Sequence, residues 1–301
     1  MSGAMRNADE FALSSLEVAR SFDRAAGSYD AAAVLQKRVR DELVSRLAMV
    51  RLAPSVVIDL GCGTGVAAAA LRRRFRRTRV LSLDLSPAML HEAGRRRRPW
   101  RRFAGICADA ANLPLADGTV DLIFSNLMLQ WCGDPEVVFR ECARVLRPGG
   151  LLTFTSFGPD TLRELRKAWA TADQYTHVNR FIDMHDLGDA MLRAGLAEPV
   201  MDVERYTLTY PDVRGLMRDL KAIGAHNVNA GRARGLTGRR ALERMTAAYE
   251  SERRDGRLPA TYEVVYGQAW ALESGLRSPA PAGEIRIPIG RIGRRGSRSQ
   301  G

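Results

Sequence analysis

A run of three glycines behind an acidic residue is the part of this sequence whose residue types and spacing best suit chemistry. Residues 59–65 read Asp-Leu-Gly-Cys-Gly-Thr-Gly and follow a short β-branched run. Gly61, Gly63 and Gly65 lack a Cβ atom, so the backbone there can turn sharply and approach a ligand closely. Such a turn at the carboxyl end of a strand is typical of nucleotide-like ligand sites, although a tight strand-to-helix connection or a dinucleotide site would also use glycine.

Two further acidic residues narrow the kind of ligand. A dinucleotide site would have its third glycine three residues after the second, and an acidic residue about 20 positions further on. Here Gly65 follows Gly63 by two positions only. Asp84 ends a second apolar run, where a carboxylate can accept hydrogen bonds from both ribose hydroxyls, and Asp109 ends a third. The spacing therefore departs from the dinucleotide pattern.

The elements that must position these residues follow from the alternation of apolar runs and helical stretches. Strands are predicted at 56–60, 80–85, 103–109, 120–126 and 151–157, and helices between them at 66–75, 87–97 and 135–146. This alternation favours βαβ units, and hence an α/β fold with a parallel sheet covered by helices. In the flanking regions, helical structure is predicted at 11–50, 159–172, 184–194 and 239–253, and one further helix is predicted to end near Gly224. Strands are predicted at 200–210 and 261–271, and a loop at 225–238.

The net charge of +12 suggests a nucleic-acid binder, but its distribution argues otherwise. Of 46 basic residues only Lys37, Lys167 and Lys221 are lysines, which indicates a general arginine bias. Five arginines lie in the tail from Gly283, and two arginine runs flank the second predicted strand. No stacking platform of aromatic and basic residues is evident. A solvated surface, or one that attracts an acidic partner, explains the charge better than nucleic acid does.

Other composition signals exclude several classes. No apolar run approaches the roughly 18 to 20 residues of a membrane helix, and the first ten residues lack the pattern of a secretory signal. The four cysteines, at 62, 107, 132 and 142, match no metal-ligand spacing. We therefore expect a cytoplasmic protein with reduced thiols and no metal.

The glycine motif together with Asp84 and Asp109 resembles the class I S-adenosylmethionine-dependent methyltransferases over about residues 55–157. The resemblance implies a Rossmann-like fold, with a mostly parallel seven-stranded sheet, helices on both faces and a helical lid or insertion. It also implies S-adenosylmethionine as co-substrate. The residues that it assigns to cofactor binding are Asp59, Gly61, Cys62, Gly63, Thr64, Gly65, Asp84, Leu85, Asp109, Ala110, Asn126 and Leu127.

Segments outside that core resemble one subfamily, the malonyl-[acyl-carrier protein] O-methyltransferases of biotin synthesis. The likeness runs from Phe22 to Trp270 through the segments 22–36, 125–135, 177–181, 220–232 and 258–267. It implies methylation of the free carboxylate of malonyl-acyl carrier protein, or of malonyl-CoA, to the methyl ester.

The alternative function is that of an arginine hydroxylase-like relative of the mitochondrial complex I assembly factor. Residues 130–132, Gln-Trp-Cys, and the 177–181 segment favour the methyltransferase. An RNA methyltransferase is disfavoured, because the residues after the fourth strand read Ser-Asn-Leu-Met rather than an Asn-Pro-Pro-Tyr type of motif.

This resemblance also suggests an organisation along the chain. Residues 1–50 would form a helical lid segment and 51–157 the cofactor-binding core. Residues 158–258 would hold substrate-side helices, a core strand and a loop, 259–273 the final strand of the sheet, and 274–301 a disordered basic tail.

On the substrate side, four residues are candidates for catalysis. A malonyl carboxylate is ionised at neutral pH, so attack on a methyl group needs no general base. We expect Tyr29 to donate a hydroxyl near the transfer site, Arg180 to bind the carboxylate bidentately, and Gln130 and Trp131 to shape the acceptor pocket. Packing for Tyr29 and Trp131, and solvation for Arg180, are the alternatives.

Two further expectations concern the acceptor and its carrier. His177 and His226 could position backbone or the thioester end of the acceptor. An acidic carrier protein would be attracted by basic residues near the lid and the 220–234 loop. These residues include Arg218, Lys221, Arg232 and Arg234.

Overall fold

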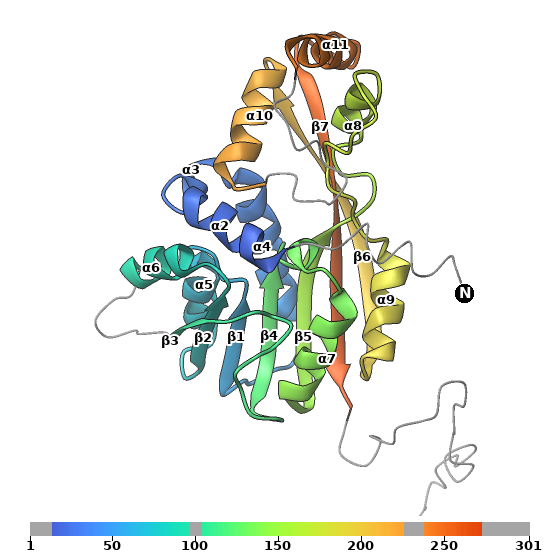
Figure 1. Cartoon of the computed structure of the whole chain (residues 1–301). Helices are drawn as coiled ribbons and strands as arrows, with labels where there is room; N and C mark the ends of the chain where they lie inside the picture. The colour runs from blue at the N-terminus through green and yellow to red at the C-terminus, as the bar shows by residue number, and fades with distance from the viewer. Residues whose placement is uncertain (1–13, 97–103, 226–237, 273–301) are drawn as a thin grey trace, which may run out of the picture.

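The computed structural model describes residues 14–96, 104–225 and 238–272, and its centre is one seven-stranded sheet. The strand order is β3-β2-β1-β4-β5-β7-β6 (Figure 1). The first five strands run parallel, whereas β7 is antiparallel to both β5 and β6. The strands are β1 (Val56–Leu60), β2 (Arg79–Asp84), β3 (Ala104–Cys107), β4 (Val120–Asn126), β5 (Leu146–Phe157), β6 (Leu196–Tyr210) and β7 (Leu258–Ala271). The predicted α/β class and the mostly parallel seven-stranded sheet are confirmed.

Helices cover both faces of this sheet, and each face has its own apolar core. On one face lie α4 (Val34–Arg46), α5 (Val66–Arg74) and α6 (Pro87–Arg95), with Leu43, Leu71 and Phe124 fully buried. On the other lie α7 (Pro135–Val145) and α9 (Met184–Arg193), which pack on Ile123 and Phe154. Alternate residues of β4 enter the two cores, as the two-residue period of a strand requires.

The N-terminal segment, predicted as helical over 11–50, is largely helical in its described part and is divided into separate helices. It forms α2 (Ser15–Ala25), α3 (Tyr29–Ala32) and α4, with breaks at Ala26–Ser28 and at Ala33. Gly27 is a poor helix former, and Ala33 adopts φ −79° and ψ 46°, which is outside the helical region. The chain can therefore turn twice and fold α2 and α3 over the strand ends, where Figure 1 shows them.

The last two strands are longer than predicted and carry a second layer of helices. β6 begins at Leu196 rather than at residue 200, and near its start Glu198 adopts φ +53° where the register with β7 shifts between Ala197 and Val200. This bulge hides the start of the strand in the sequence. Beyond the other strands, β6 and β7 continue to the end of the molecule that carries α8 (Arg163–Ala170), α10 (Val213–Ala222) and α11 (Arg239–Glu250) (Figure 1).

Several predictions concern residues outside those that the structure describes. They include His226, Arg232 and Arg234, most of the second arginine run, and the basic tail from residue 274. Within the described ranges, no helix has the length and apolar character needed to cross a membrane.

Candidate active site

The carboxyl ends of β1, β2 and β4 meet the end of β3 at one edge of the sheet and enclose a cavity of about 230 Å³. We call it the aspartate cavity, because Asp84 and Asp109 both line it. It brings together many residues that the sequence assigned to cofactor binding. These are Gly61, Gly63, Asp84, Leu85, Asp109, Ala110, Asn126 and Leu127.

The glycine turn after β1 forms the floor of this cavity through left-handed backbone. Gly61 and Gly63 have φ values of +71° and +51°. The Gly61 N–H donates to the Leu83 carbonyl at 2.8 Å, which holds the turn against β2. A Cβ atom on Gly61 would lie 2.3 Å from Cγ of Met128. Glycine at this position therefore satisfies both the backbone angle and the close approach of the Met128 side chain.

Asp84 is held in place by backbone donors on both of its oxygens. The Gly63 N–H donates to Oδ2 and the Ser86 N–H to Oδ1, each at 2.8 Å. Burial raises the pKa of Asp84 above its ordinary value, although these N–H groups act in the opposite direction. Asp109 accepts one hydrogen bond from a side chain and one from the backbone, from Ser15 Oγ at 3.1 Å and from the Ala111 N–H at 2.9 Å. The two carboxylates thus line one cavity with fixed orientations.

A second cavity of about 260 Å³ lies on the other side of the glycine turn. We call it the glycine cavity. Asp59 lines it, is only 1% exposed, and has one oxygen, Oδ2, with no hydrogen-bond partner among the described residues. Burial and then the nearby Asp84 raise the pKa of Asp59 to about 7. An unpartnered buried carboxyl oxygen requires a donor, so this wall suits a ligand with a cationic N–H group.

The glycine cavity also contains basic residues that sequence reasoning missed. Lys37 and Arg40, one turn apart on α4, both line it, as does Arg96 after α6. Facing Asp59, they create a pocket with a negative and a positive side. A zwitterionic amino-acid group would match such a pocket. Their helical spacing was visible in the sequence, but which side of α4 meets the glycine turn was not.

The predicted residues Cys62 and Thr64 line the glycine cavity rather than the aspartate cavity. Gly65 lines neither, and instead begins α5 as its left-handed N-cap residue with φ +78°. The residues of the glycine motif therefore serve three different places: the aspartate cavity, the glycine cavity and the start of α5.

Helices α2 and α3 form a roof over both cavities. Ser15, Val18, Phe22 and Tyr29 line the aspartate cavity from above. Asp23 fastens α2 to the start of α6, since its Oδ1 accepts hydrogen bonds from Ser86 Oγ at 2.5 Å and from a backbone N–H at 3.1 Å.

Two further contacts fasten this roof on either side. Asp30 on α3 accepts a hydrogen bond from Thr64 Oγ1 at 2.6 Å and forms an ion pair with Arg96. On the α10 side, Ser21 Oγ donates to the Gly224 carbonyl at 3.0 Å, and Ser28 Oγ donates to the Ala222 carbonyl at 3.0 Å. The roof is thus held by the glycine turn, by α6 and by the end of α10.

Tyr29 lies where the two cavities meet and lines both, together with Gly61, Gly63 and Asn126. Burial, with the nearby Asp84 and Asp30 adding to it, raises the pKa of the Tyr29 phenol well above its ordinary value. The hydroxyl therefore keeps its proton and is available as a hydrogen-bond donor. Asn126 is fixed by its contacts with the Gln36 carbonyl at 3.2 Å and with a threonine hydroxyl of β5.

Trp131, at the end of the 3-10 helix η2 (Leu129–Trp131), lies between the aspartate cavity and a third cavity. This cavity has a volume of about 400 Å³ and mostly apolar walls, and we call it the apolar cavity. Of the described residues, Trp131 alone lines both. The other walls come from α8, the segment 177–181, α10 and β7.

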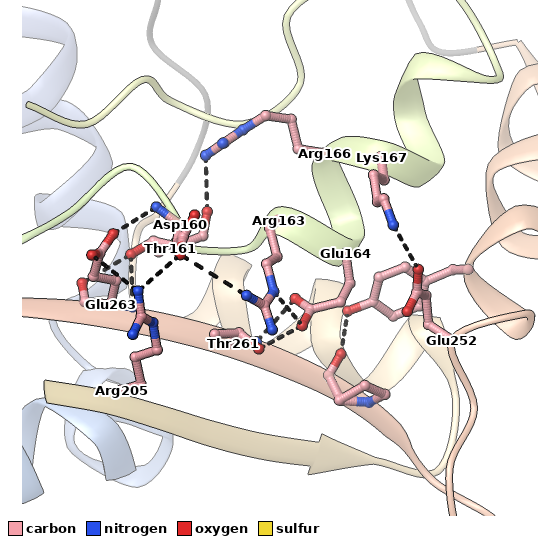
Figure 2. A network of polar contacts seen from close by, with 12 residues as sticks. Asp160, Thr161, Arg163, Glu164, Arg166, Lys167, Arg205, Glu252, Thr261 and Glu263 are labelled. Carbon is pink, nitrogen blue, oxygen red and sulfur yellow. Dashed lines mark hydrogen bonds and ion pairs between the residues drawn. The ribbon is translucent and has the colours of Figure 1, made fainter.

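The α8 wall of the apolar cavity is fixed to β7 by the polar network in Figure 2. Glu164 is 5% exposed and accepts hydrogen bonds from the backbone N–H and the hydroxyl of Thr261, at 3.1 and 2.5 Å. Thr161 Oγ1 donates to the Glu263 carbonyl at 3.0 Å, and the Leu162 N–H donates to the Thr261 carbonyl at 2.6 Å. Buried and satisfied bonds of this kind hold a wall rigidly.

Gln130 and Arg180 line none of these three cavities, but their own cleft adjoins two of them: it shares Cys132 and Gly133 with the aspartate cavity, and Asn179 and Phe181 with the apolar cavity. Both line a small cleft of about 20 Å³ beside Asn179. Arg180 is exposed, and Gln130 uses its Nε2 to donate to the Leu127 carbonyl at 2.6 Å. Arg180 shares no cavity with Tyr29 or Trp131, although Gln130, the chain neighbour of Trp131, lines the same cleft as Arg180.

No group of three or more His, Cys, Asp and Glu side chains within the described ranges is placed to hold a metal ion.

Comparisons with known proteins agree with this geometry. The methyltransferase domain family matches residues 58–154. The YcgJ protein of Bacillus subtilis, a solved structure, shares the fold with a TM-score of 0.56 at 14% identity, over 79% of this chain and 99% of its own. The malonyl-[acyl-carrier protein] O-methyltransferase of Laribacter hongkongensis is 57% identical over 84% of this chain and 88% of its own length. That of a Methylovorus species is 52% identical over 90% and 94%. The chain therefore belongs to the malonyl-[acyl-carrier protein] O-methyltransferase family, within the class I methyltransferases.

Proposed function

We propose that this protein transfers a methyl group from S-adenosylmethionine to the free carboxylate of a malonyl group carried by an acyl carrier protein, giving the methyl ester. The observation that carries the proposal is the meeting of the aspartate cavity and the apolar cavity at Trp131. A nucleoside site and an apolar acceptor site then share one wall. The names of the relatives supply the acceptor. They do not favour the arginine hydroxylase-like alternative.

The residues present fit the cofactor at three points. Asp84, with its oxygens already fixed by backbone donors, would accept from the ribose hydroxyls, and Asp109 with Ala110 would lie at the adenine. Asp59 and the basic side of the glycine cavity would hold the zwitterionic methionine end. When bound, the cofactor supplies an electrophilic methyl group on a sulfonium.

The protein's own part in the reaction is orientation and exclusion of water. One oxygen of the acceptor carboxylate would form a bond to the methyl carbon as the carbon–sulfur bond breaks. The negative charge of the carboxylate and the positive charge of the sulfonium would both be lost in this step. No proton has to move, so a general base is not needed. Tyr29, whose hydroxyl keeps its proton, would donate to the second carboxylate oxygen, and Phe22 and Trp131 would keep water away.

The carrier protein would approach the side of the molecule that carries α10. Arg218 and Lys221 are exposed there, and Lys221 also lines the apolar cavity. An acidic carrier would be attracted to this side and would present its acyl group to the cavity.

The test is a methyl-transfer assay with the purified protein, S-adenosylmethionine and malonyl-carrier protein, followed by mass spectrometry. We expect the acyl group to gain one methylene, and acetyl-carrier protein, which lacks a free carboxylate, to gain nothing. Absence of the methyl ester with the malonyl substrate would overturn the proposal. Restoration of growth to a biotin-requiring strain would further separate this activity from arginine hydroxylation.

A further inference from the structure

The segment in which α10 ends lies between the apolar cavity and the roof over the cofactor cavities (Figure 1). We call residues 221–225 the α10 end. Three of its residues line the apolar cavity: Lys221, Ile223 and Ala225. The carbonyls of the other two, Ala222 and Gly224, accept hydrogen bonds from the hydroxyls of Ser28 and Ser21, each at 3.0 Å. One short segment therefore contacts both the space proposed for the acceptor and the helices that cover the cofactor.

Gly224 packs directly on the roof, and its backbone closes α10. Its φ is +73°, and a Cβ atom there would lie 3.2 Å from Cβ of Ala25 and 3.3 Å from Cδ1 of Phe22, both on α2. The Ala225 N–H donates to the Leu220 carbonyl at 2.9 Å, which is the bond of a helix that ends in a left-handed glycine. Glycine at position 224 therefore allows α10 to end here and α2 to approach it closely.

The contacts of the α10 end continue to residues of the candidate active site. Phe22, which packs on Gly224, lines the aspartate cavity and meets Trp131 edge to face. Ser28, which the α10 end holds, directly precedes Tyr29, and Tyr29 lines both the aspartate and the glycine cavity. A shift of the α10 end would therefore displace two residues that enclose the cofactor cavities.

We propose that Gly224 is a positioning residue for methyl transfer, through which the acceptor and the cofactor strengthen each other's binding. This inference rests on the proposed function. An acyl group and its arm in the apolar cavity would contact Ile223 and Ala225, and these contacts stabilise the arrangement of the α10 end that holds the roof. A ligand shifts an equilibrium by its differential affinity for the two states, and the coupling between two ligands is reciprocal. The roof is thus held most firmly when both substrates are present and water has to be excluded.

The test measures the affinity for S-adenosylhomocysteine by calorimetry, with and without saturating malonyl-carrier protein. S-adenosylhomocysteine has no methyl group to transfer, so the complex with both ligands does not turn over. We expect the malonyl-carrier protein to lower the Kd of S-adenosylhomocysteine by about 5- to 20-fold, and S-adenosylhomocysteine to lower the Kd of malonyl-carrier protein by the same factor. Hydrogen exchange of the backbone amides of α2 and α3 should be slowest with both ligands bound.

A matched pair of glycine variants separates the contact with the roof from backbone strain. Gly224→Ala places its Cβ against α2 and should reduce the coupling to less than about twofold. Gly195→Ala has a similar backbone, with φ +85°, but nothing lies within 4 Å of its Cβ. It should lose stability through the left-handed backbone alone and keep the wild-type coupling.

A second set of variants tests the hydrogen bonds from the roof. Ser21→Ala with Ser28→Ala removes both hydroxyl donors to the α10 end. We expect the mutual effect of the two ligands on their Kd values to disappear in this double variant, while each ligand still binds alone. Ser251→Ala is the control, because that hydroxyl donates to the Ala248 carbonyl at 2.7 Å within the end of α11. It should keep the wild-type coupling.

The outcomes distinguish the two proposals. If the wild-type protein does not methylate malonyl-carrier protein, the proposed function fails. If it does, but S-adenosylhomocysteine binds equally well with and without malonyl-carrier protein, the coupling is wrong while the proposed function stands. Wild-type coupling in Gly224→Ala would contradict the role of Gly224. Should Gly224→Ala fail to fold, the double serine variant decides, and wild-type coupling there would exclude the α10 end as the connection.

Discussion

Phe22 of α2 meets Trp131 of η2 edge to face, with ring centroids 5.2 Å apart and an interplanar angle of 89°. Phe22 belongs to the roof over the aspartate cavity, and Trp131 is the wall between that cavity and the apolar cavity. Edge-to-face aromatic pairs of this geometry are favourable. The closed roof and the partition between the two cavities therefore depend on the same contact.

Replacement of Trp131 should affect transfer more than cofactor binding. Trp131→Ala removes the shared wall and admits water, so we expect kcat to fall by about 10- to 100-fold. The affinity for S-adenosylhomocysteine should change only a few-fold, because Asp84 and Asp109 keep their partners. Trp131→Phe, which retains an aromatic wall, is the matched control and should stay within about tenfold of wild type. Calorimetric binding and single-turnover transfer are the measurements; equal losses in both would contradict this role.

The contact between Gly61 and Met128 gives a prediction that can be reversed by a second substitution. In Gly61→Ala, the new Cβ would lie 2.3 Å from Met128 Cγ, at a backbone φ of +71°. We expect loss of measurable cofactor binding and a lowered melting temperature. Gly63→Ala has a similar positive φ but nothing within 4 Å of its Cβ, so it should show only the left-handed penalty of about 1 to 2 kcal/mol.

The double variant Gly61→Ala, Met128→Gly tests the steric part. The new Cβ would lie 2.3 Å from Met128 Cγ and 2.6 Å from Met128 Cβ, so both atoms have to be removed, and thermal stability relative to Met128→Gly alone should then recover toward that of Gly63→Ala. If Gly61→Ala lowers the stability of Met128→Gly as much as that of the wild type, the backbone angle, and not the side-chain contact, requires glycine.

The raised pKa of Asp59 predicts how cofactor affinity depends on pH. Burial raises this pKa to about 7 in the free protein, and an ammonium group at the carboxylate would lower it again on binding. Affinity for S-adenosylhomocysteine should therefore weaken as pH falls from 7 to 5.5, by up to about tenfold per pH unit. Binding in this range should release a proton, which calorimetry in buffers of different ionisation enthalpy detects.

Asp59→Asn provides the control for that measurement, because its amide cannot titrate. This variant should bind more weakly at pH 7 and show a flat profile between pH 5.5 and 7. A profile that keeps its slope in Asp59→Asn would assign the proton to another group.

Asp30 is expected to govern how long the cofactor stays bound. Its carboxylate joins α3 to Thr64 at 2.6 Å and to Arg96. Asp30→Ala removes both links and should raise the dissociation rate of S-adenosylhomocysteine by about 3- to 10-fold, with the association rate little changed. Asp30→Asn keeps a partner for the Thr64 hydroxyl and should lie between. Stopped-flow measurement of both rates decides the matter, and a change confined to association would contradict a fastening role.

Salt should weaken the use of carrier-bound substrate more than that of a small substrate. Arg218 and Lys221 are exposed on the α10 side, and attraction between exposed charges is screened over about 8 to 10 Å at physiological ionic strength. We expect KM for malonyl-carrier protein to rise steeply with salt, and KM for malonyl-CoA to rise less. Arg218→Glu with Lys221→Glu should raise KM for the carrier substrate and flatten its salt dependence. Unchanged KM in this double variant would place the docking surface elsewhere.

The cofactor half of the site was more predictable from sequence than the acceptor half, for physical reasons. The strand 56–60 and the glycine turn are encoded locally, by β-branched residues followed by residues that adopt positive φ. The exposure of Arg180 and the pairing of His177 with Asp173 depend instead on how the segment after α8 packs on the rest of the fold. Arginine abundance made Arg180 impossible to distinguish from its neighbours by composition.

The helix break at Ala26–Ser28 was missed for a related reason. A single glycine at position 27 is tolerated in many helices at a cost of about 1 kcal/mol. Here the Ser28 hydroxyl donates a hydrogen bond to the Ala222 carbonyl, and the Ser21 hydroxyl donates one to the Gly224 carbonyl. These hydrogen-bond partners stabilise the turn but are distant in the sequence, so no local sequence pattern predicts the helix break.

The bond from Ser21 to Gly224 joins positions 203 residues apart, and this separation matters during protein synthesis. A ribosome adds roughly 5 to 20 residues per second, so about 10 to 40 s pass between the appearance of α2 and that of its partner just after α10. Until then the glycine turn and Asp84 can form, but α2 lacks the partner that fastens it on the α10 side. A growing chain therefore acquires the floor of its cofactor site well before the roof can be secured, and chains that end before residue 224 should be the ones most exposed to proteases at α2 and α3.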